Sequence, residues 1–392
     1  MAPIVILSAA RTPLGSFQGS LSGVPAPRLG AVAIKGAIAR AGVGPGDVTD
    51  VIMGNVLQAG LGQAPARQAC LYAGLPPSVR AVTVHKVCGS GLQAVLLGAH
   101  ALGMGDASLV VAGGMENMSA SPYLLPKARE GYRMGDQQVV DSMIRDGLWD
   151  PYNDLHMGAC AEQCAREYAF SREEQDAYAC ESFRRANAAQ EDGRLAQEII
   201  PVEVADAKGN AATVDRDEGP ARVRYEKIPS LRPAFERDGT ITAANASSIN
   251  DGAAALVLAT EPAGTPGGRR PLARIAAFGS HAQDPLRFAT APIAAARTAL
   301  GRAGWTAAQV DLWEVNEAFA VVPMAFAREF SVPRDRLNVR GGAIALGHPI
   351  GASGARILVT LLHAMRDRGA RRGVAAICIG GGEGMAVCVE LV

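Results

Sequence analysis

The chain has few aromatic residues and no excess of charge of either sign. Phe, Trp and Tyr make up 5% of its 392 residues, whereas hydrophobic residues as a whole make up 48% and glycine occurs 45 times. Such a core must be filled by small aliphatic side chains, which suits helices and strands that approach closely. The 38 basic residues balance the 38 acidic residues, so no net charge favours nucleic acid or a membrane surface as a partner.

The chain also lacks a disulfide framework and a long apolar run. Its seven cysteines are an odd number and are scattered without regular spacing, which indicates a reducing compartment. No stretch approaches the roughly 18 consecutive apolar residues of a membrane-spanning helix, and the first residues lack the pattern of a secretory signal. We therefore expect a soluble protein of the cytoplasm.

The second half of the chain repeats landmarks of the first half in the same order. These are a helix that ends in Arg-Ala-Gly, a strand that ends in Asn, a Ser-Gly pair that opens a helix, and a strand that ends in glycines. They lie in pairs at 40–42 and 302–304, Asn55 and Asn316, 90–91 and 353–354, and 113–114 and 380–382. Alternating strands and helices favour parallel sheets covered by helices. We therefore expect an α/β fold of two pseudo-symmetric βαβ-type halves with mostly parallel sheets.

Residues 119–249 interrupt this pattern, because they carry charged helical stretches such as 171–191 and several turns. Residues 250–258 then return to a strand of the first half. Residues 261–270, rich in proline and glycine, form the clearest linker. Long insertions in α/β folds commonly carry binding surface. The expected parts are an N-terminal core half of residues 1–118 plus 250–268, an inserted loop domain of 119–249, and a C-terminal core half of 269–392.

Cys88 lies where a predicted strand, 81–84, meets a predicted helix, 92–104, through a Gly-Ser-Gly turn. A side chain at such a junction projects from a sharp turn, and the positive end of the helix favours a thiolate over a thiol. This is a suitable place for a nucleophile, although a small buried cysteine is an equally ordinary interpretation of the residue alone.

Three further polar side chains stand at element ends in the second half. Asn316 follows an apolar strand, His348 lies in a glycine-rich loop, and Cys378 comes two residues before Gly380. The symmetry of the repeat would bring them together with Cys88. An imidazole within hydrogen-bond reach activates a cysteine, and backbone N–H groups of a glycine turn stabilise charge on a thioester carbonyl. Gly380 would let the backbone approach without a Cβ in the way.

Four ordered blocks of the sequence resemble the thiolase family. They are Val-Cys-Gly-Ser-Gly at 87–91, Asn-Glu-Ala-Phe at 316–319, Gly-His-Pro-Ile-Gly-Ala-Ser-Gly at 347–354 and Cys-Ile-Gly-Gly-Gly at 378–382. The resemblance covers essentially the whole chain and is nearest to the acetyl-CoA acetyltransferase (acetoacetyl-CoA thiolase) branch. It implies a layered α-β-α-β-α fold in which the insertion covers the active site and binds coenzyme A.

The resemblance implies a role for each of five catalytic residues. Cys88 would take the acyl group as a thioester, and His348 would activate it. Cys378 would act as the general acid/base, which removes a proton from the methyl group of acetyl-CoA or protonates the departing carbanion. A water held by Asn316 would form one oxyanion hole with His348, and the N–H groups of Cys88 and Gly380 would form the second.

The resemblance also implies a set of residues around the substrate. His156 and Met157 resemble a pocket motif of members that handle short acyl chains, and Ser247 corresponds to a residue that contacts pantetheine. Apolar pocket walls complete the set at Leu148, Phe235, Ala318 and Phe319. The sequence departs from common family patterns at Ala244 and Ser248, where many members have Gly, and at Glu383, where Met or Gln is more usual. Phe288 lies at a position that varies among members with different acyl preferences.

The implied activity is the condensation of two acetyl-CoA molecules to acetoacetyl-CoA and CoA, with thiolytic cleavage in reverse, in fatty acid or polyhydroxyalkanoate metabolism. A degradative 3-ketoacyl-CoA thiolase with a broader chain-length range would share every catalytic residue and is the main alternative. A carrier-protein ketoacyl synthase would carry His in place of Asn316 and lack Cys378. A thiolase-like protein that binds acyl-CoA or lipid without turnover is disfavoured by the intact catalytic set, and a cysteine hydrolase has no feature that admits water selectively.

We expect no cofactor, because coenzyme A and acyl-CoA are substrates. Cys160, Cys164 and Cys180 have no fourth ligand at a spacing that would hold a metal ion. The resemblance implies a homo-oligomer, with dimers formed through the core and a tetramer formed through a loop of the insertion near 126–136. We therefore expect a homotetramer without nucleic-acid or membrane partners.

Overall fold

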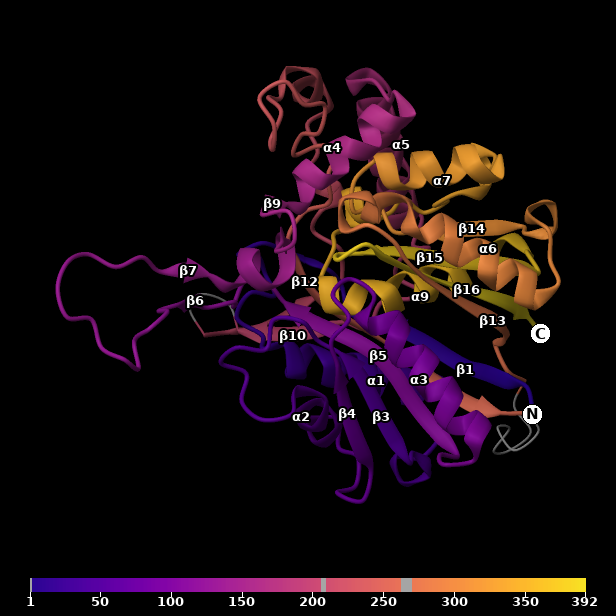
Figure 1. The fold of residues 1–392 in the computed structure, drawn as a ribbon. Helices are drawn as coiled ribbons and strands as arrows, with labels where there is room; N and C mark the ends of the chain where they lie inside the picture. The colour runs from indigo at the N-terminus through magenta and orange to yellow at the C-terminus, as the bar shows by residue number, and fades with distance from the viewer. Residues whose placement is uncertain (1, 206–208, 262–269) are drawn as a thin grey trace.

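The computed structural model describes residues 2–205, 209–261 and 270–392, and its core is a ten-stranded mixed sheet (Figure 1). The strands are β1 (Ile4–Arg11), β2 (Gly15–Ser16), β3 (Asp50–Gly54), β4 (Arg80–Val84), β5 (Leu109–Asn117), β12 (Asn250–Thr260), β13 (Ala273–Ala282), β14 (Leu312–Val315), β15 (Arg372–Ile379) and β16 (Glu383–Leu391). They follow the order β14-β15-β16-β13-β1-β12-β5-β3-β4, and β2 pairs with β12. The two halves of the chain join where β1 pairs with β13 at Val5 and Ile6.

Helices cover the strands in three layers. They are α1 (Ala26–Ala41), α2 (Pro65–Tyr72), α3 (Ser90–Met104), α4 (Met157–Tyr168), α5 (Arg172–Glu191), α6 (Ala291–Ala303), α7 (Val321–Phe330), α8 (Ala343–Leu346) and α9 (Ile350–Arg368). α1 packs on β1, β5 and β12, α6 packs on β13 and β16, and α3 and α9 lie between the two halves, where they pack on each other. Separate clusters of buried aliphatic side chains fill these layers. The predicted layered α/β fold is confirmed.

The expectation of mostly parallel sheets is wrong. β3 runs parallel to β4 and β5, and β14 runs parallel to β15. β12 is antiparallel to β1 and β5, and β16 is antiparallel to β13 and β15. The reason is that in each half the last strand lies antiparallel beside the strand that contains or precedes the glycines, β12 beside β5 after the inserted segment and β16 beside β15 after a tight turn. Helical crossovers are visible in the sequence, whereas these returning strands carry no signal of their direction.

The inserted segment leaves and re-enters the core at one point, because Asn117 at the end of β5 pairs with Asp251 of β12. The equivalent strands β15 and β16 are joined by a tight turn at 380–382. The segment carries α4, α5 and three short strand pairs, namely β6 (Tyr123–Leu124) with β7 (Val140–Asp141), β8 (Trp149–Asp150) with β9 (Leu155–His156), and β10 (Val202–Ala205) with β11 (Ala211–Val214). The predicted boundary at 268 and 269, and most of the predicted linker 261–270, lie outside the described residues, so the division there stays a prediction.

One helix among the described residues, Val87–Met104, is long and apolar enough by composition to span a membrane, with a mean hydropathy of 1.4. It is not an unbroken apolar run, because glycine and polar residues interrupt the stretch. Half of it is buried inside the protein, where α3 packs on α9 and β5. This is the position of a core helix.

Glycines let α3 and α9 meet backbone to backbone in the middle layer. A Cβ atom at Gly91 would lie 2.7 Å from the backbone nitrogen of Ala355, and one at Gly354 would lie 2.5 Å from that of Leu92. Real Cβ atoms do not approach backbone so closely, so both positions require glycine. The starts of the two helices are thereby held side by side.

Replacement of Gly354 by Ala should therefore destabilise the protein by about 1–3 kcal/mol, since the added methyl group overpacks a backbone contact. Urea unfolding followed by circular dichroism measures the effect. Gly301→Ala is the matched control, because Gly301 is also inside a helix but has open space around its Cβ position. This control should gain about 0.5–1 kcal/mol. Equal stability of Gly354→Ala and the parent protein would contradict the contact.

Candidate active site

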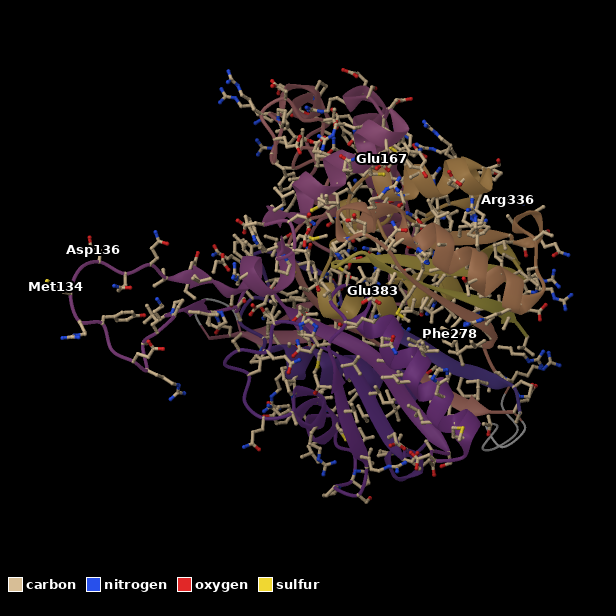
Figure 2. The ribbon with its side chains drawn as sticks, viewed as in Figure 1. Met134, Asp136, Glu167, Phe278, Arg336 and Glu383 are labelled. Carbon is tan, nitrogen blue, oxygen red and sulfur yellow. The ribbon has the colours of Figure 1, made fainter. Side chains whose placement is uncertain are left out.

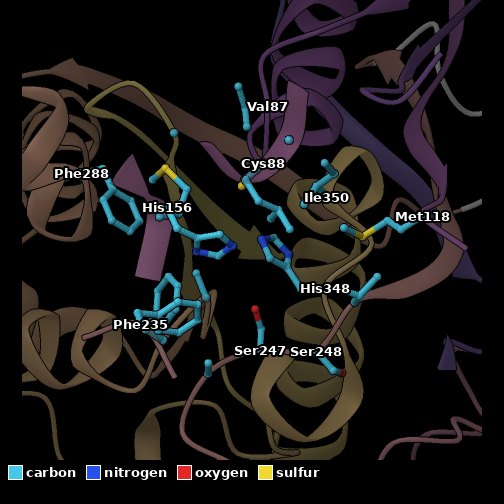
Figure 3. Close-up of a pocket in the computed structure, with 18 residues that line it drawn as sticks. Val87, Cys88, Met118, His156, Phe235, Ser247, Ser248, Phe288, His348 and Ile350 are labelled. Atoms are coloured by element: carbon cyan, nitrogen blue, oxygen red, sulfur yellow. The ribbon is translucent and has the colours of Figure 1, made fainter. Parts of the chain in front are cut away.

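A cavity of about 210 Å³ opens where the starts of α3 and α9 meet the inserted segment. Cys88, His156 and His348 point into it from three different parts of the chain (Figure 3). Of the predicted site residues, those that line it are Cys88, His348, Gly380, Leu148, His156, Met157, Phe235, Ser247, Ala318 and Phe319. Asn316 and Cys378 are fully buried at the ends of β14 and β15.

Cys88 lies in a strained turn that leads into α3. The preceding residue, Val87, has a φ of 44°, a region that β-branched residues rarely adopt. The hydroxyl of Ser90 holds this turn, because it donates to the Val87 carbonyl at 2.7 Å and accepts the N–H of Lys86 at 2.8 Å. α3 begins at Ser90, so the sulfur of Cys88 stands just before the helix.

Burial opposes the thiolate that a position just before α3 favours. Burial raises the pKa of Cys88 to about 11, and the carboxylate of Glu116 adds to the rise. The backbone N–H groups of Gly380 and Cys88 lower the pKa of the thiol by donating to the sulfur. Desolvation of the thiolate raises the pKa by more than these two groups lower it. The nucleophile is therefore a thiol that needs a base.

The hydrogen bonds around His348 decide which of its ring nitrogens can act as that base. Ser353 donates its hydroxyl hydrogen to the carbonyl of Pro349 at 2.9 Å. Its oxygen is then the acceptor for the Nδ1–H of His348 at 2.6 Å. Nε2 consequently carries the lone pair, and it has no hydrogen-bond partner among the described residues. Burial and the nearby charge of Arg356 lower the pKa of His348 to about 3, so the ring is neutral.

Asn250 fixes the loop that carries His348. Its Oδ1 accepts the backbone N–H of His348 at 3.0 Å and the hydroxyl of Ser248 at 2.7 Å, while its Nδ2 donates to the Gly15 carbonyl at 2.9 Å. Gly347 has a φ of 119°, and a Cβ there would lie 2.3 Å from the Asn250 side chain. The roles of Asn250 and Ser353 are not among those predicted from the sequence, although a Ser five residues after the histidine, near a helix start, is a usable signal for such a hydrogen bond.

Asn316 and Cys378 are buried polar residues that are not among those lining the cavity. Both polar atoms of the Asn316 side chain are buried without a hydrogen-bond partner among the described residues. Leaving such a group unpaired costs about 1–3 kcal/mol, which favours a partner supplied by a bound molecule or water. Burial, together with the sulfur of Cys88, holds the pKa of the Cys378 thiol well above its usual value.

The glycines at 380–382 meet different constraints. A Cβ at Gly380 would meet Val87 at 3.4 Å and Met157 at 3.7 Å, which are ordinary contacts, so the predicted reason for this glycine, close approach to the substrate, stays a prediction. Gly381 and Gly382 have φ values of 87° and 84°, and a Cβ at Gly382 would lie 2.2 Å from the Gln283 carbonyl oxygen. Those two residues are the ones that the turn between β15 and β16 requires to be glycine.

Aromatic rings form the wall of the cavity opposite Cys88 (Figure 3). His156 stacks on Phe235 at 4.8 Å between ring centroids, and Phe319 meets the edges of Phe235 and Phe288 at 6.0 and 6.2 Å. Nδ1 of His156 accepts the N–H of Gly158 at 3.1 Å, so its Nε2 carries the proton. Burial lowers the pKa of His156, and the neutral ring is thus a hydrogen-bond donor through Nε2.

Comparison with known proteins gives concordant matches over the whole chain. The model described as "Thiolase, N-terminal domain" matches residues 4–262, and "Thiolase, C-terminal domain" matches residues 269–391. The chain is 53% identical to acetyl-CoA acetyltransferase of Pseudomonas aeruginosa over 99% of both proteins, and 52% identical to that of Cupriavidus necator over 100% of both. The crystal structure of Acat5 thiolase from Ascaris suum in complex with coenzyme A matches with a TM-score of 0.94 and 44% identity over 100% of both chains.

The hydrogen bond from His348 to Ser353 yields a prediction about the reactivity of Cys88. In Ser353→Ala, Nδ1 loses its acceptor, so the proton no longer prefers that nitrogen and Nε2 is less available as a base. Alkylation of Cys88 by iodoacetamide should slow about tenfold, in line with roughly 1–2 kcal/mol for such a hydrogen bond.

Thr360→Val is the control for this experiment, because Thr360 lies on the same helix and also loses one buried hydrogen bond, to Glu198 at 3.1 Å. Its alkylation rate should equal that of the parent protein. Equal rates in Ser353→Ala and Thr360→Val would show that Ser353 does not set the state of His348.

Proposed function

The chain belongs to the thiolase family of acyltransferases, and we propose that it condenses two molecules of acetyl-CoA to acetoacetyl-CoA and CoA and catalyses the reverse thiolysis. One observation carries this proposal: the thiol of Cys88 and Nε2 of His348, which has no partner among the described residues, face one cavity, and the second thiol, Cys378, is buried close enough to Cys88 for the two sulfurs to interact. The two acetyl-CoA acetyltransferases that share 53% and 52% of their residues with this chain over its full length support the proposal.

The first half-reaction would transfer an acetyl group to Cys88. Nε2 of His348 takes the thiol proton as the sulfur attacks the carbonyl carbon of acetyl-CoA. The bond from that carbon to the sulfur of coenzyme A breaks, and the leaving thiolate receives a proton from Cys378. The N–H groups of Cys88 and Gly380, which already donate to the sulfur, are suited to stabilise the oxyanion of this step.

The second half-reaction would form the carbon–carbon bond. The Cys378 thiolate left by the first step removes a proton from the methyl group of a second acetyl-CoA, and its high pKa makes it a strong base. The resulting enolate oxygen is stabilised by Nε2–H of the His348 imidazolium and by the unpaired amide of Asn316 through a water. The enolate attacks the acetyl carbonyl, the bond to Cys88 breaks, and His348 returns its proton to the thiol.

Coenzyme A has a place beside this cavity. A second cavity of about 460 Å³ shares Ser248 and Ile249 with the first and is lined by basic side chains of the inserted segment. These are Arg222, Arg224 and Lys227. Guanidinium and ammonium groups bind phosphates well. The phosphates of coenzyme A would lie there, and its pantetheine arm would pass Ser248 toward Cys88. The relative from Ascaris suum, solved in complex with coenzyme A, supports coenzyme A as the ligand.

The acyl end of the cavity supports the short-chain reaction over the broader degradative one. Phe235, Phe288 and Phe319 pack edge to face there and leave a cavity of about 210 Å³ for the acyl group and the end of the pantetheine arm. A 3-ketoacyl chain of several more carbons would have to displace these rings.

Thiolysis rates test the proposal. With CoA as the second substrate, acetoacetyl-CoA should be cleaved much faster than 3-ketohexanoyl-CoA or 3-ketodecanoyl-CoA, because the aromatic wall limits acyl length. Cys88→Ala should abolish all three activities. Comparable rates on the longer chains would instead assign a broad 3-ketoacyl-CoA thiolase, and activity that survives in Cys88→Ala would overturn the acyl-enzyme route.

We further propose that the protein is a homotetramer that acts in the cytoplasm. All seven cysteines are free, as expected in a reducing compartment. β4 ends the sheet, and Val82 on it is 54% exposed, so a second copy is suited to pack there. The loop between β6 and β7 projects from the body and carries Met134, 88% exposed, near its tip (Figure 2). Exposed apolar side chains on a projecting loop favour a contact between dimers.

Light scattering should report a tetramer for the parent protein and a dimer for the double variant Leu125→Asp, Met134→Asp. Both side chains are exposed, so their replacement should leave the fold of a single copy intact. Met104→Asp, which charges another exposed apolar residue at the end of α3 and away from that loop, is the control and should remain tetrameric. A monomer mass for the parent protein would overturn the proposed assembly.

A further inference from the structure

An ion pair joins the two turns that supply backbone N–H groups to Cys88. Nζ of Lys86 contacts the carboxylate of Glu383, and the two side chains are 23% and 37% exposed. Lys86 lies two residues before Cys88 in the turn that enters α3, and Glu383 is the first residue of β16, directly after the turn that begins at Gly380.

These two turns belong to opposite halves of the molecule. In the sheet, β4 and β16 are separated by β13, β1, β12, β5 and β3, so no strand pairing sets the distance between the turns. The turn at 380–382 consists of three glycines and therefore has more conformational freedom than any other three residues would have. An oxyanion hole needs both donors held within about 0.5 Å of their productive positions.

Two kinds of contact join the turns. Apolar packing is one, since Ile379 fills the space beside Gly89. A Cβ at Gly89 would lie 2.4 Å from Cδ1 of Ile379. This packing is non-directional and tolerates small slides. The ion pair from Lys86 to Glu383 is a directional contact and connects the chain segments just before Cys88 and just after Gly382.

We propose that Lys86 and Glu383 are a positioning pair, which sets the separation between the N–H of Cys88 and the N–H of Gly380. The proposal rests on the proposed function for the reaction that this separation serves. The pair acts through geometry, because its two charges cancel at the cavity and both side chains are partly screened by solvent. When the pair is broken, the glycine turn moves and its N–H leaves the sulfur.

The sign of one pKa change separates this role from an electrostatic one. If the pair positions Gly380, both Lys86→Gln and Glu383→Gln should raise the pKa of Cys88, since either variant withdraws an N–H donor from the thiolate. If instead the separate charges acted on the sulfur, loss of the cation would raise the pKa and loss of the anion would lower it. The pH dependence of Cys88 alkylation by iodoacetamide measures this without any coenzyme A substrate.

The steady-state rates should follow the same pattern. Each single variant should lower kcat for acetoacetyl-CoA thiolysis about three- to tenfold, a part of the 10²–10³-fold loss known for deletion of an oxyanion donor. KM should change less than about twofold, since the pair touches neither cavity that would bind coenzyme A. The swapped pair, Lys86→Glu with Glu383→Lys, should restore kcat and the pKa of Cys88.

Arg274→Gln is the matched control, because Arg274 and Glu261 form an ion pair at 2.8 Å, 38% and 32% exposed, and neither residue lines the cavity. It should leave both quantities unchanged. The positioning role is overturned if Glu383→Gln lowers the pKa of Cys88, if the single variants match the control, or if the swapped pair fails to recover. Absence of thiolase activity in the parent protein would refute the proposed function alone, since the alkylation result stands independently.

Discussion

The backbone contact between α3 and α9 is the constraint on which the site depends. Cys88 and His348 each lie two residues before the start of their helix, so whatever holds the helix starts together also holds the nucleophile beside its base. The contact extends into the sheet, where a Cβ at Gly114 would lie 2.1 Å from the carbonyl oxygen of Gly351. Glycine at these positions is thus a requirement of the active geometry.

A buried carboxylate reinforces this junction between the halves. Glu116 of β5 accepts the backbone N–H of Gly351 in α9 at 2.9 Å, and it also accepts the N–H of Val56 at 2.9 Å and the side-chain amide of Asn55 at 2.7 Å. Burial raises the pKa of Glu116 to about 7. The same desolvation keeps Cys88, Cys378 and His348 uncharged, so negative charge would develop in the site during the reaction, where N–H donors are already in place.

The landmarks that the two halves of the chain share made the site predictable from the sequence. The strand that ends in Asn316, the loop of His348 and the glycine turn after Cys378 are local patterns, and their order mirrors that around Cys88, so their convergence could be predicted. The antiparallel return of β12 and β16 could not, since strand direction depends on distant partners. The roles of Ser353 and Asn250 and the raised pKa of Cys88 also depend on atoms brought together only by folding. The requirement for glycine at 381 and 382 follows from backbone φ angles, which the sequence does not show.

The central claim is that Cys88 carries the acetyl group and that Cys378 provides the base of the carbon–carbon step. It is tested most directly by trapping the intermediate in a variant without that base, because solvent can replace Cys378 as the proton donor to the leaving thiolate but cannot replace it as the base. Cys378→Ser protein is incubated with acetyl-CoA, and its peptides are mapped by mass spectrometry. The account predicts one acetyl group, located on Cys88, with no acetoacetyl-CoA released. An unmodified Cys88, or an acetyl group on another residue, would contradict it.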